Sequence, residues 1–155
     1  MQRIADLTKE TVYLAVPVED EVVYLDSCSP YGVIPARDLQ GGRAPMYCTA
    51  IGKAMLAYLP EKIIQTYEKR KLEKFTENTI TSFAALKKEL GSIRLQGYAV
   101  DNMEHEYGIK CIGMPIRKAD GQVYAAISIS GPSLRMSDEK LAQFAAILRQ
   151  NISSL

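Results

Sequence analysis

The feature that most constrains the fold is a pair of strand-like segments near the end of the chain, residues 109–117 (IKCIGMPIR) and 122–130 (QVYAAISIS). They are joined by Ala119-Asp120-Gly121, and Asp-Gly between two such runs is a strong signal for a hairpin. Side chains alternate across a strand, so one face of this hairpin is apolar. That face carries Ile112, Met114, Ile116, Ile127 and Ile129. The pattern predicts an antiparallel sheet buried on at least one side.

The rest of the chain supplies further strands and groups of helices. Residues 11–18 and 22–28 are rich in β-branched and aromatic residues, and the polar turn between them predicts a second antiparallel hairpin. Short strands are expected near Val33-Ile34 and over 98–101. Helical spacing, capping residues and stops predict helices over 2–9, from Thr49 to Leu59, over 61–70, from Ser82 to Gly97, and over 138–152. Hairpins with helices grouped between them indicate an α+β fold, an antiparallel sheet flanked by helices.

Composition excludes several classes of protein. The 155 residues are 47% hydrophobic and 24% charged, which is typical of one globular domain. Lys and Arg number 19 and Asp and Glu 18, so the chain lacks the basic excess of a nucleic-acid-binding module. No apolar run approaches the ~18–20 residues of a membrane span, and the start MQRIADLTKE lacks the apolar core of a signal peptide. We therefore expect a cytoplasmic protein that does not contact a membrane.

The cysteines and the histidine limit the chemistry. Cys28, Cys48 and Cys111 are odd in number and widely spaced, which favours reduced thiols over a disulfide framework. His105 is the only histidine, so a metal site built from several histidines of one chain is ruled out. We expect neither a metal nor a cofactor.

The second face of the last hairpin carries small polar side chains, Cys111, Ser128 and Ser130, where a solvent-facing strand would carry Lys, Glu, Thr or Arg. One interpretation is a packed layer that encloses a space for a small polar ligand, oriented by the hydroxyls. The other is a close contact between sheet and helix, which also favours small residues. The residues leave both open.

A second candidate is Thr49-Ala50-Ile51-Gly52-Lys53, which enters a helix after a Gly- and Pro-rich segment. Unpaired N–H groups at a helix start attract a carboxylate or phosphate, and glycine in the first turn lets a ligand approach the backbone. The alternative is that Thr49 is a plain N-cap and Gly52 only permits close packing. The spacing does not match a Walker loop.

A third candidate is Asp101-Asn102-Met103-Glu104-His105-Glu106, which places three carboxylates around the histidine. It could supply a general base with an orienting acid, or a metal fragment completed by Cys48 or Cys111. The simpler interpretation is a solvated turn for Glu104, His105 and Glu106. Asp101, at the end of a strand, is expected to point inward.

Four segments, taken together, resemble the effector-binding domain of the IclR family of bacterial transcriptional regulators. The most specific blocks are G-Y-x-x-D…E…G-x-x-C-I-x-x-P-I and S-I-S-G-P-S-x-R, and the likeness covers nearly the whole chain. The segments are PMYCTAIGKAMLAYLP (45–60), ENTITSFAALKKEL (77–90), GYAVDNMEHEYGIKCIGMPI (97–116) and DGQVYAAISISGPSLRMSDEKL (120–141).

The resemblance implies a GAF/profilin-like domain that binds a small oxo acid, sugar-derived acid or aromatic acid. It implies that residues 1–9 end an interdomain linker helix, that 10–155 form the effector-binding domain, and that an N-terminal winged helix-turn-helix domain outside this chain binds DNA. Family members typically form dimers and often tetramers. The residues that match the family's pocket are Ala50 and Ile51, through their backbone amides, with Asp101, Ile109, Cys111, Ser128 and Ser130. Relatives that respond to glyoxylate tend to have Ser-Gly where this chain has Thr49-Ala50, which leaves the effector's identity open.

The leading hypothesis is therefore a sensor module and not an enzyme, in which a small carboxylate effector changes DNA binding by the intact regulator. The rival is a thiol-dependent redox or hydrolytic enzyme on a GAF-like fold that uses Cys48 or Cys111, because fold alone does not determine function. A third hypothesis is a dimerising module that binds no ligand.

Overall fold

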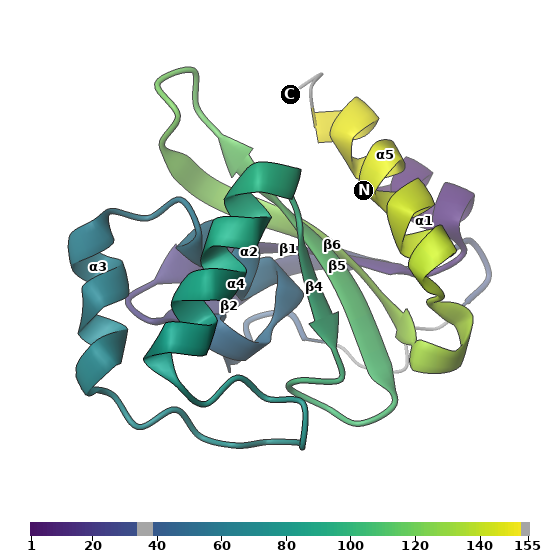
Figure 1. The fold of residues 1–155 in the computed structure, drawn as a ribbon. Helices are drawn as coiled ribbons and strands as arrows, with labels where there is room; N and C mark the ends of the chain where they lie inside the picture. Colours follow the sequence, from purple (N-terminus) through teal and green to yellow (C-terminus); the bar gives the residue numbers. More distant parts are fainter. Residues whose placement is uncertain (34–38, 153–155) are drawn as a thin grey trace.

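A computed structural model describes residues 1–33 and 39–152 of the chain. Its centre is an antiparallel sheet with the strand order β3-β2-β1-β6-β5-β4 (Figure 1). The strands are β1 (Thr11–Val18), β2 (Glu21–Cys28), β3 (Arg43–Pro45), β4 (Ala99–Asn102), β5 (Ile109–Arg117) and β6 (Val123–Pro132). The predicted α+β class is confirmed.

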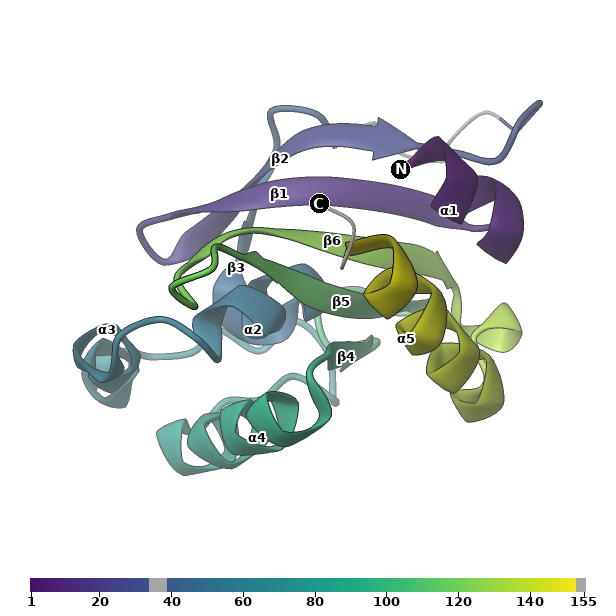
Figure 2. The ribbon, with the colours of Figure 1, turned by 90° about the horizontal axis from the view of Figure 1, so that it is seen from above.

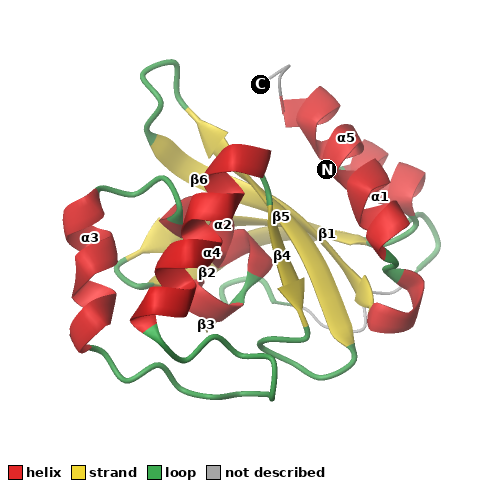
Figure 3. Cartoon of the chain, in the orientation of Figure 1, coloured by secondary structure: helices red, strands yellow, loops and turns green. Residues whose placement is uncertain are grey.

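Helices cover both faces of this sheet (Figures 2 and 3). On one face α1 (Gln2–Thr8) and α5 (Asp138–Ile152) bury the apolar side of β5 and β6. On the other face α2 (Ala50–Leu56) packs mainly against β5 and β6, and α4 (Phe83–Gln96) packs on α2, farther from the sheet. α3 (Glu61–Gln65) lies beside them. Short 3-10 segments complete the elements, at Met46–Cys48, Thr66–Lys69 and Ser133–Arg135. In the described residues no helix is long and apolar enough to cross a membrane.

The register of the last hairpin confirms the predicted alternation. Ile112 pairs with Ile129 and both are fully buried under α1 and α5. Cys111 pairs with Ser130 and Gly113 with Ser128, and these side chains lie on the opposite face, toward α2. The hairpin therefore contributes to the core on one side and to a polar surface on the other.

Most predicted helix limits agree with the structure because their caps are local. The Ser82 hydroxyl accepts a hydrogen bond from the Ala85 amide at 3.3 Å, and Gly97 ends α4 in the left-handed conformation with φ 84°. The predicted helix over 61–70 is instead α3 followed by a 3-10 turn.

Two short strands differ from the others in how far the sequence pattern could predict them. β3, Arg43–Pro45, was not predicted because it is only three residues long and depends on pairing with β2. The strand predicted near Val33-Ile34 reaches into residues 34–38 and so lies outside the described residues.

Candidate functional site

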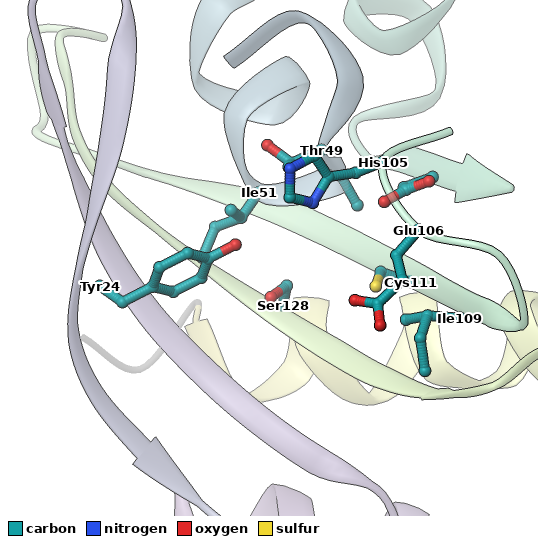
Figure 4. A pocket seen from close by; sticks show the side chains of 10 residues that line it. Tyr24, Thr49, Ile51, His105, Glu106, Ile109, Cys111 and Ser128 are labelled. Atoms are coloured by element: carbon teal, nitrogen blue, oxygen red, sulfur yellow. The ribbon is translucent and has the colours of Figure 1, made fainter. Parts of the chain in front are cut away.

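A small cavity of about 60 Å³ lies between the start of α2, the middle of β5 and β6, and the loop after β4. Figure 4 shows side chains from these elements and from β2 directed toward the same space. The lining residues are Tyr24, Thr49, Ala50, Ile51, Asp101, His105, Glu106, Ile109, Cys111 and Ser128.

Glycines bring the first turn of α2 against the sheet. A Cβ on Gly113 of β5 would lie 2.5 Å from the Ala50 carbonyl oxygen and 2.8 Å from the Ile51 nitrogen. A Cβ on Gly52 would lie 2.4 Å from the Cα of Met46. Both contacts are with backbone atoms, so no side chain could rotate away to make room. The first turn of α2, whose N–H groups have no partner within the helix, thus reaches the cavity wall.

Thr49 caps this turn, as predicted. Its hydroxyl oxygen accepts a hydrogen bond from the Gly52 amide at 3.2 Å, and the hydroxyl donates to the Pro45 carbonyl at 2.9 Å. These bonds fix the direction in which α2 leaves the preceding segment. Simple capping and a ligand-facing helix start are therefore compatible, because the same residue both caps the helix and lines the cavity.

The acidic group in the wall is Asp101 of β4, which is 4% exposed, and its inward orientation agrees with the prediction. Its Oδ1 accepts a hydrogen bond from the Glu104 amide at 2.6 Å. Burial, with the charge of Glu104 adding to it, raises the pKa of Asp101 to about 7, although this amide bond and Lys53 act in the opposite direction. The carboxyl is therefore about half protonated at neutral pH, and its protonated form can donate a hydrogen bond.

Tyr24 and Cys111 complete a lining that is polar and largely uncharged. Burial raises the pKa of the Tyr24 hydroxyl and of the Cys111 thiol, so both remain protonated at neutral pH. The Cys111 thiol donates to the Ser130 hydroxyl at 3.2 Å. These two groups can hydrogen-bond an oxygen-rich ligand without adding a negative charge to the cavity wall.

The cavity brings together residues that were proposed from separate segments. Ala50, Ile51, Asp101, Ile109, Cys111 and Ser128 all line it, whereas Ser130 lies beside Cys111 on the neighbouring strand and is not among the lining residues. The close contact between sheet and helix is present at Gly113, which packs on α2, and Cys111 and Ser128 border the cavity beside it.

Four lining residues, Tyr24, Thr49, His105 and Glu106, were not among the proposed effector contacts. Tyr24 comes from β2, and only the alternation of Val22 and Tyr24 on the inner face would have pointed to it. The interpretation as a solvated turn is wrong for Glu104, which is 6% exposed. His105 and Glu106 are partly exposed in this turn and also line the cavity. The turn is drawn inward because Glu104 meets the buried Lys53.

The arrangement of these residues does not favour a metal site or a nucleophilic cysteine. Across residues 1–33 and 39–152 the structure contains no group of three or more His, Cys, Asp or Glu that could hold a metal ion. Burial raises the pKa of Cys48 as well as that of Cys111, which suppresses the nucleophilic thiolate. A nucleophilic cysteine needs the opposite shift.

We expect Cys48 and Cys111 of the folded protein to react with iodoacetamide at pH 7.5 at least about a hundredfold more slowly than the urea-unfolded chain. The Cys48 thiol is buried, and the raised pKa of both thiols keeps them protonated. Peptide mass spectrometry of time points measures each site separately. Rapid labelling of either cysteine in the folded state would restore the thiol-enzyme hypothesis.

The fold and site define an α+β domain in which a sheet and the start of a helix enclose a small polar cavity. A family model described as the C-terminal domain of the bacterial transcriptional regulator IclR matches residues 1–155. The chain therefore belongs to the IclR family of bacterial transcriptional regulators, as its motifs predicted.

Individual relatives agree with this assignment. The HTH-type transcriptional regulator KdgR of Escherichia coli K12 is 40% identical over 149 residues, which cover 96% of this chain and 57% of KdgR. The crystal structure of Thermotoga maritima IclR has a TM-score of 0.90 and 38% identity, over 97% of this chain and 62% of the other. The inducer-binding domain of an Acinetobacter PobR double mutant, solved with 3-hydroxybenzoic acid, has a TM-score of 0.86 and 26% identity, over 99% and 93% of the two chains. This chain thus spans little more than half the length of the curated regulator.

Proposed function

We propose that this chain is the effector-sensing domain of its regulator and that it binds a small organic acid in the cavity beside α2. The observation that carries the proposal is the lining itself. Amides of the first turn of α2, the protonated Asp101, and the Cys111 and Ser128 side chains converge on one space. Donors of this kind suit the oxygens of a carboxylate and of a neighbouring oxo or hydroxyl group.

The size of the cavity favours the smallest of the expected acids. Its volume of about 60 Å³ lies well below the roughly 300–1,000 Å³ of pockets that hold drug-sized ligands. A two- to four-carbon oxo or hydroxy acid therefore needs less rearrangement of the lining than an aromatic acid does. The PobR domain, by its description, was solved with an aromatic acid, which makes 3-hydroxybenzoate the comparison ligand.

In the intact regulator the acid would change the affinity for DNA by favouring one arrangement of subunits over another. DNA would be bound by an N-terminal winged helix-turn-helix domain beyond this chain, and the subunits would assemble as a homodimer or homotetramer. Residues 1–9 would form the end of the helix that links this domain to residues 10–155. The packing of α1 on β1 and α5 provides a mechanical connection between that linker and the sheet.

The proposal is tested by calorimetric titration of the domain with glyoxylate, pyruvate, glycerate and 3-hydroxybenzoate. At least one of the three small acids should bind more tightly than 3-hydroxybenzoate. Failure of all three small acids to bind at pH 6, where Asp101 is protonated, would contradict the proposal.

The two serines provide a matched pair of variants. Ser128→Ala should weaken binding of the tightest acid about five- to tenfold, the cost of one lost hydrogen bond of roughly 1 kcal/mol. Ser130→Ala should change it less than about twofold, because this hydroxyl contacts the Cys111 thiol and not the cavity. The same titration measures both affinities. Equal effects of the two variants would show that the ligand does not bind in this cavity.

A further inference from the structure

A buried ion pair stands directly behind the cavity wall. Lys53 of α2 is fully buried, and its Nζ lies 2.5 Å from Oε1 of Glu104 and 3.0 Å from Oε1 of Glu89. The Lys53 side chain is 0% exposed and that of Glu104 7%, so the pair is largely withdrawn from solvent. Buried pairs carry a large desolvation cost and are weak stabilisers compared with apolar packing.

The pair is also incompletely satisfied. The second carboxylate oxygen of Glu104, Oε2, is buried and has no hydrogen-bond partner. A buried acceptor without a partner costs free energy that stability alone does not explain. The cost points to a role other than holding the fold together.

Lys53 contacts the chain on both sides of Asp101, at Val100 and at Glu104. The ammonium donates to the Val100 carbonyl at 2.7 Å, one residue before Asp101. It also binds the Glu104 carboxylate, and the Glu104 amide donates to Asp101 Oδ1 at 2.6 Å. A single cation therefore fixes the backbone that precedes Asp101 and the turn that holds its carboxyl. Because Lys53 is on α2, it also fixes both against the helix that carries Ala50 and Ile51.

Charge counting shows why this matters for an anionic ligand. Glu89 and Glu104 both contact the one ammonium of Lys53, which leaves one negative charge in excess, so ionised Asp101 would add a second next to the cavity. The carboxylate of an effector would add to it. Binding of an anion is therefore expected to require a proton on Asp101.

We propose that Lys53 and Glu104 are positioning residues for effector recognition, which hold Asp101 at the cavity wall and set the pH range in which it accepts an anionic ligand. This inference rests on the proposed function for its ligand but can be tested without one. The titratable groups that face Asp101 or share its cavity are Tyr24 on β2, Cys48 before α2, Lys53 on α2, Glu104, His105 and Glu106 in the loop, and Cys111 on β5.

The test is a pH profile of pyruvate affinity by calorimetry between pH 5.5 and 8.5, for the wild type, Lys53→Met and Glu104→Gln. In the wild type, affinity should fall about tenfold per pH unit above neutrality, because each bound anion requires one proton. Lys53→Met removes a positive charge and should move the onset of this fall to higher pH by about half a unit or more. Glu104→Gln removes a negative charge and should move it to lower pH by a similar amount.

The two variants should move the pH at which affinity begins to fall in opposite directions. A role in stability alone would weaken binding in both variants without these opposite changes. Lys88→Met, at an exposed lysine of α4, is the matched control and should leave the profile unchanged. Lys53→Met should also weaken the limiting affinity at pH 5.5, because the loop is no longer tied to α2. A common onset in all variants would overturn the inference.

The ¹³C titration of the Asp101 carboxyl by NMR needs no ligand. An upward displacement of its midpoint in Lys53→Met and a downward one in Glu104→Gln would support the inference even if pyruvate does not bind. Absence of pyruvate binding together with these displacements would count against the proposed effector and not against the pair. Should Lys53→Met fail to fold, Glu104→Gln alone decides, because an unmoved midpoint contradicts the role.

Discussion

Gly113→Ala should abolish measurable effector binding and lower the free energy of unfolding by roughly 3 kcal/mol or more. The new methyl group would lie 2.5 Å from the Ala50 carbonyl oxygen and 2.6 Å from its carbon. These are backbone atoms of α2, and β5 is paired on both sides, with β4 and β6. The start of α2 must therefore move away from the sheet. The Ala50 and Ile51 amides move with it, so the wall of the cavity is lost.

Urea unfolding and calorimetric titration measure the two effects. Gly91→Ala is the matched control, since a Cβ on Gly91 of α4 would meet nothing within 4 Å. Alanine inside a helix is more favourable than glycine by about 0.5–1 kcal/mol, so this variant should be slightly more stable and bind like the wild type. A Gly113→Ala protein that binds the acid normally would show that the first turn of α2 is not part of the site.

The sequence carries the information for the sheet because each hairpin depends on local alternation and a short turn. In the middle of β5 and β6, Ile112, Met114, Ile127 and Ile129 alternate with Cys111, Gly113, Ser128 and Ser130, and this alternation determines which face packs under α1 and α5. Helix α4 could also be predicted from the sequence, because Ser82 and Gly97 mark its two ends. β3 could not be predicted, because its three residues show no alternation and form a strand only by pairing with β2.

The cavity could be predicted in part, and the missing part has a physical reason. Strand alternation predicts that Cys111 and Ser128 point to the same face of the sheet. That they lie close to Asp101 and Ile51 was predicted only from the family resemblance. Glu104 was misinterpreted because an acidic turn is normally solvated. Only a contact across 51 positions in the chain, to Lys53, draws it inside. Hydrophobic periodicity relates only residues within one helix or strand, so it cannot predict a contact between residues this far apart in the sequence.

The charge state of Asp101 leads to the second large effect. Its pKa rises from an ordinary value of 3.8 to about 7, so the folded protein holds a proton that the unfolded chain releases. Between these two values the folded state binds more protons than the unfolded state. Stability must therefore decrease as the pH rises from about 4 to about 7, and the loss is complete above the higher value.

Asp101→Asn should remove this loss. The asparagine Oδ1 can still accept the hydrogen bond from the Glu104 amide, and the side chain is neutral at every pH. The variant should match the wild type near pH 4 and exceed its unfolding free energy at pH 8 by up to about 4 kcal/mol, at 1.36 kcal/mol per unit of pKa displacement.

Urea unfolding of both proteins at several pH values between 4 and 8 measures the difference directly, so contributions from other titrating groups cancel. Asp120→Asn, in the exposed turn between β5 and β6, is the matched control for replacing an aspartate whose Oδ1 also accepts a backbone hydrogen bond. An Asp101→Asn protein less stable than the wild type at pH 8 would show that the ionised carboxylate is stabilised in the fold. In that case the cavity would present a fixed negative charge, and an anionic effector would be excluded along with the proton-dependent recognition derived from Lys53 and Glu104.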